Sequence, residues 1–148
     1  MINENSTKAE VLEAVKEWGS RLQYASDELR GDREVVLAAV KNQWEALEFA
    51  SEELKGDREV VLTAVSQLGY ALNYASDELK DDRDFILEAV TENWLALEYA
   101  STEFKDDKEI VLEAVKQAGY AGDFASEELR CEMAECWAEC IEQEVKND

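Results

Sequence analysis

A block of 25 residues recurs five times along this chain, and the copies align without an insertion or a deletion. Two dipeptides mark the register. Ala-Val stands at Ala14-Val15, Ala39-Val40, Ala64-Val65, Ala89-Val90 and Ala114-Val115. Ala-Ser stands at Ala25-Ser26, Ala50-Ser51, Ala75-Ser76, Ala100-Ser101 and Ala125-Ser126. A fixed period of this length predicts a solenoid, in which each unit buries its apolar face only by stacking on its neighbours.

Each copy opens with a residue suited to begin a helix, namely Thr7, Asp32, Asp57, Asp82 or Asp107. Such a side chain accepts a hydrogen bond from a free backbone N–H of the first turn, and Thr7 with Glu10 also fits a capping box. We therefore divide the chain into an N-terminal tail (1–6), five repeats and a C-terminal capping helix with its tail (132–148). The repeats span residues 7–31, 32–56, 57–81, 82–106 and 107–131.

Within a unit, the pattern predicts two helices. The apolar run 35–40 is bounded by a cap and by helix-forming residues, which favours a helix over a strand. Leu62 and its equivalents are Leu in all five units, so we expect a buried slot. The second helix carries Leu47, Ala50 and Leu54 on one face, and Ser51 before two glutamates is an N-cap signature at which this helix can break. Each unit is thus expected to be a helical hairpin.

The ends of the units and of the array carry further signals. Units close at Gly31, Gly56, Asp81 and Asp106, where Gly suits a left-handed helix cap. The apolar slot of Val35 is Glu10 in the first unit and Glu135 in the last half unit, as capping repeats require. Cys131 replaces the closing Gly and can let the preceding helix run on into 132–145. The fold class is therefore all-α: a solenoid of about five and a half 25-residue helical-hairpin repeats with a C-terminal capping helix.

Aromatic residues recur at two kinds of position. Tyr24, Phe49, Tyr74, Tyr99 and Phe124 recur every 25 residues, which we interpret as core packing. The corner of each unit alternates instead between Gly (19, 69, 119) and Trp (44, 94), which gives a second period of 50 residues. We expect the corner aromatics to pack between adjacent units, and we retain them as candidate partner-binding residues: Trp44, Tyr70, Trp94 and Tyr120.

The net charge of −21 comes from 36 acidic and 15 basic residues. Residues 1–74 hold 14 acidic and 8 basic groups (net −6), and residues 75–148 hold 22 and 7 (net −15). Phosphate is repelled by such a surface, so direct binding to nucleic acid or an anionic membrane is disfavoured and a basic protein partner is favoured. Acidic candidates for contact with that partner are Asp81, Asp84, Asp106 and Glu109. Acidity that only keeps the array soluble is the alternative interpretation.

The residues needed for catalysis or metal binding are missing from the pattern. The chain has no His and no Gly-rich phosphate loop, so we expect no enzyme activity and no cofactor. Cys131, Cys136 and Cys140 lack the two close pairs of a structural zinc site, and we interpret them as small apolar residues or a regulatory thiol. The acidic clusters at 81–84 and 106–109 lack the glycine of a calcium loop. We expect no metal.

The repeat resembles a family of acidic tandem helical repeats catalogued as a domain of unknown function. The resemblance lies in Asp-Arg-Glu-Val-Val-Leu-Ala-Ala-Val at 32–40, its near copy at 57–65, and Tyr-Ala-Ser-Asp-Glu-Leu-Lys at 74–80. It covers residues 7–131. It implies a helical fold, no known activity and no catalytic residues.

Two functions are compatible with these features. The first is a non-catalytic protein–protein interaction scaffold with a strongly acidic surface. The second is an acidic mimic of nucleic acid that inhibits a DNA- or RNA-binding enzyme, as in counter-defence. Carboxylates spaced regularly along a rod would favour the mimic, and carboxylates scattered over all faces the scaffold. The polar start and the lack of a long apolar run predict a cytoplasmic location.

Overall fold

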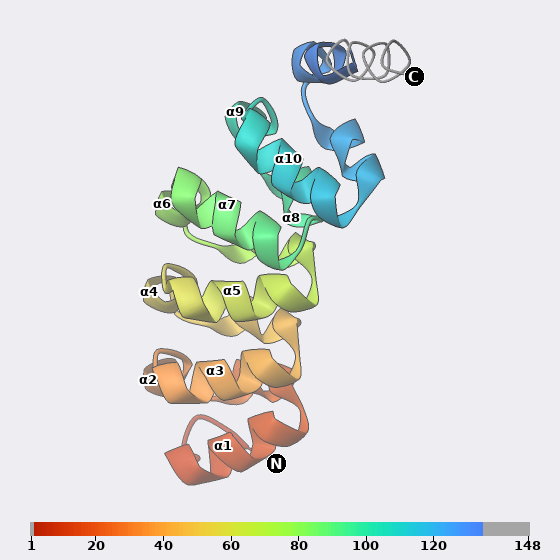
Figure 1. Ribbon diagram of the computed structural model, residues 1–148. Helices are drawn as coiled ribbons and strands as arrows, with labels where there is room; N and C mark the ends of the chain where they lie inside the picture. The colour runs from red at the N-terminus through yellow and green to blue at the C-terminus, as the bar shows by residue number, and fades with distance from the viewer. Residues whose placement is uncertain (1, 135–148) are drawn as a thin grey trace, which may run out of the picture.

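The structure is a computed structural model that describes residues 2–134. Each repeat contributes one long α-helix of ten residues, and these helices stack side by side (Figure 1). They are α1 (Lys8–Glu17), α3 (Arg33–Asn42), α5 (Arg58–Gln67), α7 (Arg83–Glu92) and α10 (Lys108–Gln117). The first residue of every unit caps its helix, since the side chains of Thr7 and of the four Asp residues accept backbone N–H groups of the first turn.

The second layer is built from shorter pieces. A six-residue 3₁₀-helix follows the long helix in four units: η1 (Gly19–Tyr24), η2 (Trp44–Phe49), η3 (Gly69–Tyr74) and η4 (Gly119–Phe124). In the fourth unit, α8 (Ala96–Tyr99) takes this place. A one-turn α-helix comes next: α2 (Asp27–Arg30), α4 (Glu52–Lys55), α6 (Asp77–Lys80) or α9 (Thr102–Lys105). The second arm of each hairpin is therefore mainly 3₁₀ and is broken where the sequence analysis allowed a break.

The interruption falls at the recurring Ala-Ser pair. The Ser76 hydroxyl accepts the N–H of Leu79 at 3.4 Å and so begins α6. The backbone N–H of Ser76 donates to the carbonyl of Lys55 in the preceding unit at 2.9 Å. Since an extended Ser exposes its N–H to the neighbouring repeat, the break joins adjacent units, and it confirms the N-cap signature seen in the sequence.

One apolar core runs through the stack. Val36 and its equivalents in the other units (Val11, Val61, Ile86 and Val111) have no exposed surface, and neither do Ala39 and Leu47. Within residues 2–134 there is no strand, and no buried polar or charged residue. The all-α solenoid predicted from the repeat is confirmed. No described helix has the length and apolar character needed to cross a membrane.

Two predictions about individual repeat positions are wrong: the left-handed cap at the end of each unit and the full burial of the Leu62 position. Gly31 closes its unit at φ −96° and ψ −2°, and Asp81 at φ −96° and ψ −3°, which is ordinary right-handed helix. No left-handed residue occurs in the described chain, so Asp fits this position without strain. Leu62 and the other leucines of its slot are only half-buried, because their side chains lie at the edge of the core on the face of the long helices.

Polar contacts also join successive repeats, and they were not predicted. The cation at the second position of each unit pairs with the capping Asp of the next: Lys8–Asp32 at 2.8 Å, Arg33–Asp57 at 2.8 Å, Arg58–Asp82 at 2.9 Å and Arg83–Asp107 at 2.7 Å. Side-chain amides bind the last carbonyls of the preceding long helix: Gln67 to Val40 at 2.6 Å, Asn93 to Val65 at 3.0 Å and Gln117 to Val90 at 2.7 Å. These contacts satisfy carbonyls that a helix end leaves free.

The last described segment departs from the repeat. Residues 127–134 form one continuous helix that passes through Cys131, where earlier units end. The prediction that loss of Gly lets this helix run on is therefore confirmed up to residue 134. The remainder of the predicted cap (135–148), with Glu135, Cys136 and Cys140, lies outside the described residues.

Candidate interaction surface

Four aromatic side chains from three successive units meet on the layer of short helices. Tyr70 lies at the centre, with ring centroids 5.8 Å from Trp44, 5.9 Å from Tyr74 and 5.2 Å from Tyr99. All three contacts are edge-to-face, the arrangement that aromatic quadrupoles favour. We call Trp44, Tyr70, Tyr74 and Tyr99 the aromatic cluster. Tyr70 remains 39% exposed, so the cluster presents a ring to solvent.

The repeat itself assembles this cluster. Trp44 begins η2 and Tyr70 is the second residue of η3, so both stand at unit corners, whereas Tyr74 and Tyr99 end η3 and α8. The expected packing between corners is confirmed. The interpretation of the 25-residue aromatics as core is only partly right: Tyr74 and Tyr99 are half-buried against the core, and Tyr24 is 54% exposed.

The other two predicted corner aromatics form a separate group. Trp94 lies 4.8 Å from Tyr120 and 6.1 Å from Phe124, measured between ring centroids. Tyr120 is 63% exposed. The structure therefore divides the four predicted corner residues into two pairs, of which only the Trp44–Tyr70 pair belongs to the larger cluster.

Carboxylates border the aromatic cluster. Burial, and then the carboxylate of Glu48, raise the pKa of Tyr74 above its ordinary value, and Glu45 adds to this shift. Burial and the carboxylate of Glu98 raise the pKa of Tyr99. A negative charge disfavours ionisation of a nearby phenol. The same negative field favours a cation placed on these rings.

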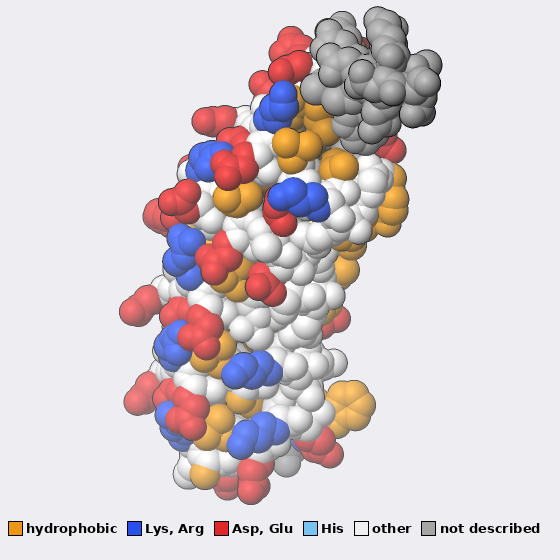
Figure 2. All heavy atoms as spheres, in the orientation of Figure 1, with side chains coloured by type: hydrophobic (Ala, Val, Ile, Leu, Met, Phe, Trp, Pro, Cys, Tyr) orange, Lys and Arg blue, Asp and Glu red, His pale blue; other side chains and the backbone are white. Residues whose placement is uncertain are grey.

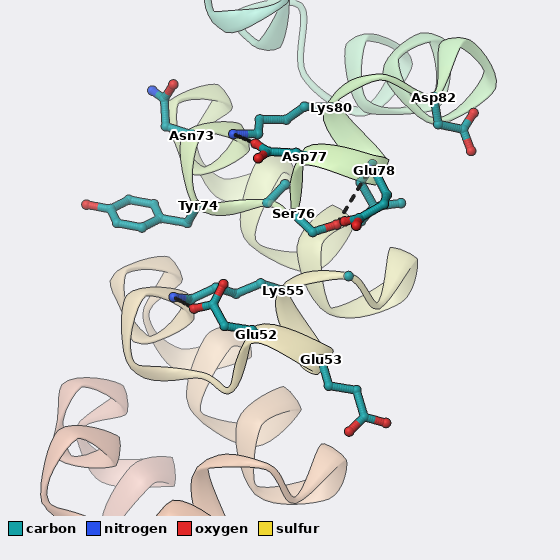
Figure 3. A pocket seen from close by; sticks show the side chains of 13 residues that line it. Glu52, Glu53, Lys55, Asn73, Tyr74, Ser76, Asp77, Glu78, Lys80 and Asp82 are labelled. Atoms are coloured by element: carbon teal, nitrogen blue, oxygen red, sulfur yellow. Dashed lines mark hydrogen bonds and ion pairs between the residues drawn. The ribbon is translucent and has the colours of Figure 1, made fainter.

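An acidic groove adjoins the cluster. It lies between α4 and α6, has a volume of about 890 Å³, and is seen from close by in Figure 3. Tyr74 lines one part of it, and Glu52, Glu53, Asp77 and Glu78 lie on the two helices that flank it. Tyr74 thus belongs to the aromatic cluster and also lines the groove, with its ring pointing away from Glu53 and Glu78 (Figure 3).

The one-turn helices of the first three units begin with two acids that have different partners, whereas α9 begins with Thr102. The first is held by the Lys or Arg three residues later, as in Glu52–Lys55 and Asp77–Lys80, both at 2.8 Å. The second is Glu in all five units and is exposed: Glu28, Glu53, Glu78, Glu103 and Glu128. None of these five forms a salt bridge within the described residues. We call them the glutamate row.

The face formed by the long helices differs from the layer of one-turn helices, because it carries cations as well as carboxylates. Blue and red side chains alternate along it in Figure 2, and the inter-unit pairs of Arg33, Arg58 and Arg83 lie among them. There cations and carboxylates largely neutralise one another. The glutamate row lies outside these ion pairs.

The four acidic candidates predicted from the sequence lie outside the groove between α4 and α6. They are Asp81, Asp84, Asp106 and Glu109, and all of them are exposed. Glu109 is paired with Arg83 at 2.6 Å, and Asp106 accepts the hydroxyl of Ser126. A count of charges along the sequence does not show which acids have a partner in space. The sequence analysis therefore did not single out Glu53 and Glu78.

No cluster of three or more Cys, Asp or Glu residues suited to a metal ion occurs between residues 2 and 134. Cys131 is exposed and is a free thiol.

The stacked repeats define an α-solenoid repeat protein. The chain matches the family described as Domain of unknown function (DUF4116) at residues 11–55, 57–105 and 82–130, and it belongs to this family. The family resemblance read from the motifs is confirmed. Each match spans nearly two 25-residue units, in agreement with the 50-residue alternation of Gly and Trp. Comparison with curated proteins gave no match, and comparison with solved structures gave none.

Proposed function

We propose that this protein is a non-catalytic interaction scaffold whose aromatic cluster and acidic groove bind a basic segment of a protein partner. The observation that carries the proposal is Tyr70, an exposed ring held among three other rings, two of which have carboxylates near them. Exposed aromatic residues in a preformed arrangement are characteristic of binding hot spots.

The chemistry of this surface favours arginine or lysine as the bound residue. A guanidinium over an aromatic face contributes about 0.5–2 kcal/mol, more as it is desolvated, and carboxylates at the border add charge-assisted hydrogen bonds. The chain already contains one such contact, since the guanidinium of Arg58 lies 5.3 Å from the ring centroid of Phe85. A phosphate-bearing ligand would be repelled by the same glutamates.

Binding of a fluorescent arginine-rich peptide, followed by anisotropy, tests this function. Tyr70→Ala should weaken binding by about fivefold or more, which corresponds to about 1 kcal/mol. Tyr70→Leu should weaken it similarly, because it retains apolar area without a π-face. Tyr24→Ala is the matched control: Tyr24 is more exposed and belongs to no aromatic pair among the described residues. Equal effects of Tyr70→Ala and Tyr24→Ala would reject the aromatic cluster as the binding site.

The second function, an acidic mimic of nucleic acid, is favoured by one observation, the regular glutamate row. Its charge spacing argues for the first function instead. Packed helices lie about 8–10 Å apart, whereas phosphates along a DNA strand lie about 3.4 Å apart along the axis. Displacement of duplex DNA from a DNA-binding enzyme, unaffected by Tyr70→Ala, would favour the mimic.

A further inference from the structure

We propose that the second aromatic group, formed by Trp94, Tyr120 and Phe124, is a second binding site, and that one extended partner segment occupies it together with the aromatic cluster through two basic residues six positions apart. This inference rests on the proposed function and specifies its ligand further. It follows from the 50-residue alternation of the unit corners, which places two equivalent ring groups on the same layer of the solenoid.

The alternation decides which junctions between units carry a ring group. Trp stands at the corner of units two and four, and Tyr stands at the following position in units three and five, at Tyr70 and Tyr120. Each Trp therefore meets the Tyr of the next unit. The other junctions lack both residues, as where Gly69 of unit three lies against Leu95 of unit four. Within the described residues, a ring group thus recurs after every two units.

The two groups have the same internal geometry. The corner Trp and the following Tyr meet edge-to-face in both, with centroids 5.8 Å apart at 81° in the aromatic cluster and 4.8 Å apart at 82° in the second group. The same Trp lies 6.2 Å from Tyr74 in the first and 6.1 Å from Phe124 in the second. The repeat therefore builds one three-ring arrangement twice, and a ligand suited to the first suits the second.

The second group is open to a ligand. Tyr120 has one aromatic contact among the described residues, with Trp94, and it is 63% exposed, against 39% for Tyr70. At the first site, the carboxylate of Glu48 lies near enough to Tyr74 to raise its pKa. The residue 50 positions later is again a glutamate, Glu98. The second group therefore offers an exposed ring and the equivalent acidic residue to a cation.

The separation of the two sites sets the spacing of the ligand. They are two units apart, and the elements η2, η3, α8 and η4 that carry them contact one another in turn (Figure 1). Since packed helices lie about 8–10 Å apart, two units correspond to about 16–20 Å. In a polyproline II segment, six residues span about 19 Å and two full turns, so the side chains at i and i+6 point the same way.

A helical ligand fits this separation less well. At about 1.5 Å per residue it would need about 11–13 residues to join the sites, a length at which an isolated helix is marginal in water. A seven-residue extended segment reaches both sites. Binding at the second site then becomes intramolecular, which raises the affinity without a new kind of contact.

Three fluorescent peptides of equal charge test the pairing of sites: Arg-(Pro)₂-Arg, Arg-(Pro)₅-Arg and Arg-(Pro)₈-Arg. Their arginines stand about 9, 19 and 28 Å apart along the chain. We expect the five-proline peptide to bind the full chain about tenfold more tightly than the other two. Tyr120→Ala should remove this preference, because one site remains, and Tyr70→Ala should do the same. Tyr24→Ala, an exposed ring outside both groups, is the matched control and should keep it.

The outcomes separate this inference from the proposed function. Equal affinity for the three peptides, with Tyr70→Ala weakening all of them, overturns the second site and retains the first. A preference that persists in Tyr120→Ala, or that is lost in Tyr24→Ala, also overturns the second site. If the arginine-rich peptide of the anisotropy assay binds and none of the three peptides does, the pairing of sites is overturned; if that peptide fails as well, so is the proposed function. Circular dichroism of each variant confirms that helicity is unchanged.

Discussion

Gly69→Ala tests how closely the repeats pack at their corners. A Cβ atom added at Gly69 would lie 2.5 Å from the carbonyl carbon of Leu95 and 2.5 Å from the backbone nitrogen of Ala96. Ordinary contacts of this kind are 3.4–4 Å, so the fourth unit would have to move by about 1 Å. Its corner cannot move alone, because Ala96 and Leu97 are fully buried.

The expected cost follows from two opposing effects. Overpacking of a well-packed core costs about 1–3 kcal/mol. Replacing Gly by Ala at a compatible backbone angle stabilises by about 0.4–1 kcal/mol through the unfolded chain. Gly69→Ala should therefore lower the free energy of unfolding by about 1–2 kcal/mol.

Gly119 provides the matched control in the same slot. No heavy atom of the described chain lies within 4 Å of a Cβ added there, so Gly119→Ala should be neutral or stabilising by up to about 1 kcal/mol. Urea unfolding followed by circular dichroism measures both variants. Equal midpoints for Gly69→Ala and Gly119→Ala would refute the close approach of unit three to unit four.

Two further predictions concern burial and charge. Leu72→Ala should cost about 2–5 kcal/mol, because Leu72 has no exposed surface, whereas Leu62→Ala at a half-buried position should cost about 1–2 kcal/mol in the same urea assay. Arg33 holds the pKa of Asp57 below its ordinary value, so this pair contributes stability that is present above about pH 4 and is lost as the pH falls through the depressed pKa. Asp57→Asn should therefore cost about 0.2–1 kcal/mol at pH 7 and progressively less in thermal melts at lower pH.

The sequence was most informative where one residue type has one local role. Asp at the start of units two to five and Ser after each Ala are helix caps whose geometry depends only on neighbouring backbone, and the structure has both, except that the Ser101 side chain makes no capping bond. The period predicted stacking, and Cys131 in place of Gly predicted a helix that runs on. These inferences succeed because capping and periodicity are local properties of the chain.

Other features depend on contacts between units, and the local pattern of a single sequence does not predict such contacts. The 3₁₀ conformation of η3 arises where its residues pack against α5 and α8, and the Leu62 slot is half-exposed because neighbouring long helices leave its outer side uncovered. The aromatic cluster unites residues with different periods, Tyr70 from the corner set and Tyr74 from the 25-residue set. The aromatic residues that recur every 25 residues were predicted to be core from their recurrence alone.

The candidate site could be identified only once it was known which charges pair in space. Glu52 and Glu53 are adjacent in the chain, but only Glu52 is held by Lys55. A signal was present, since the second residue after the recurring Ser is Glu in every unit, whereas the first is Asp, Glu or Thr. That pattern has a local explanation as well, because acids favour the first turn of a helix, and only the structure adds the groove and the rings.

The measurement that tests the central claim most directly is amide and indole NMR of the full chain during titration with the arginine-rich peptide of the anisotropy assay. The largest shift changes should fall on the Trp44 indole, on Tyr70 and on the amides of Glu53 and Glu78. Unchanged signals at these positions, with the main changes on the long-helix face around Leu62, would contradict a binding surface formed by the aromatic cluster and the acidic groove.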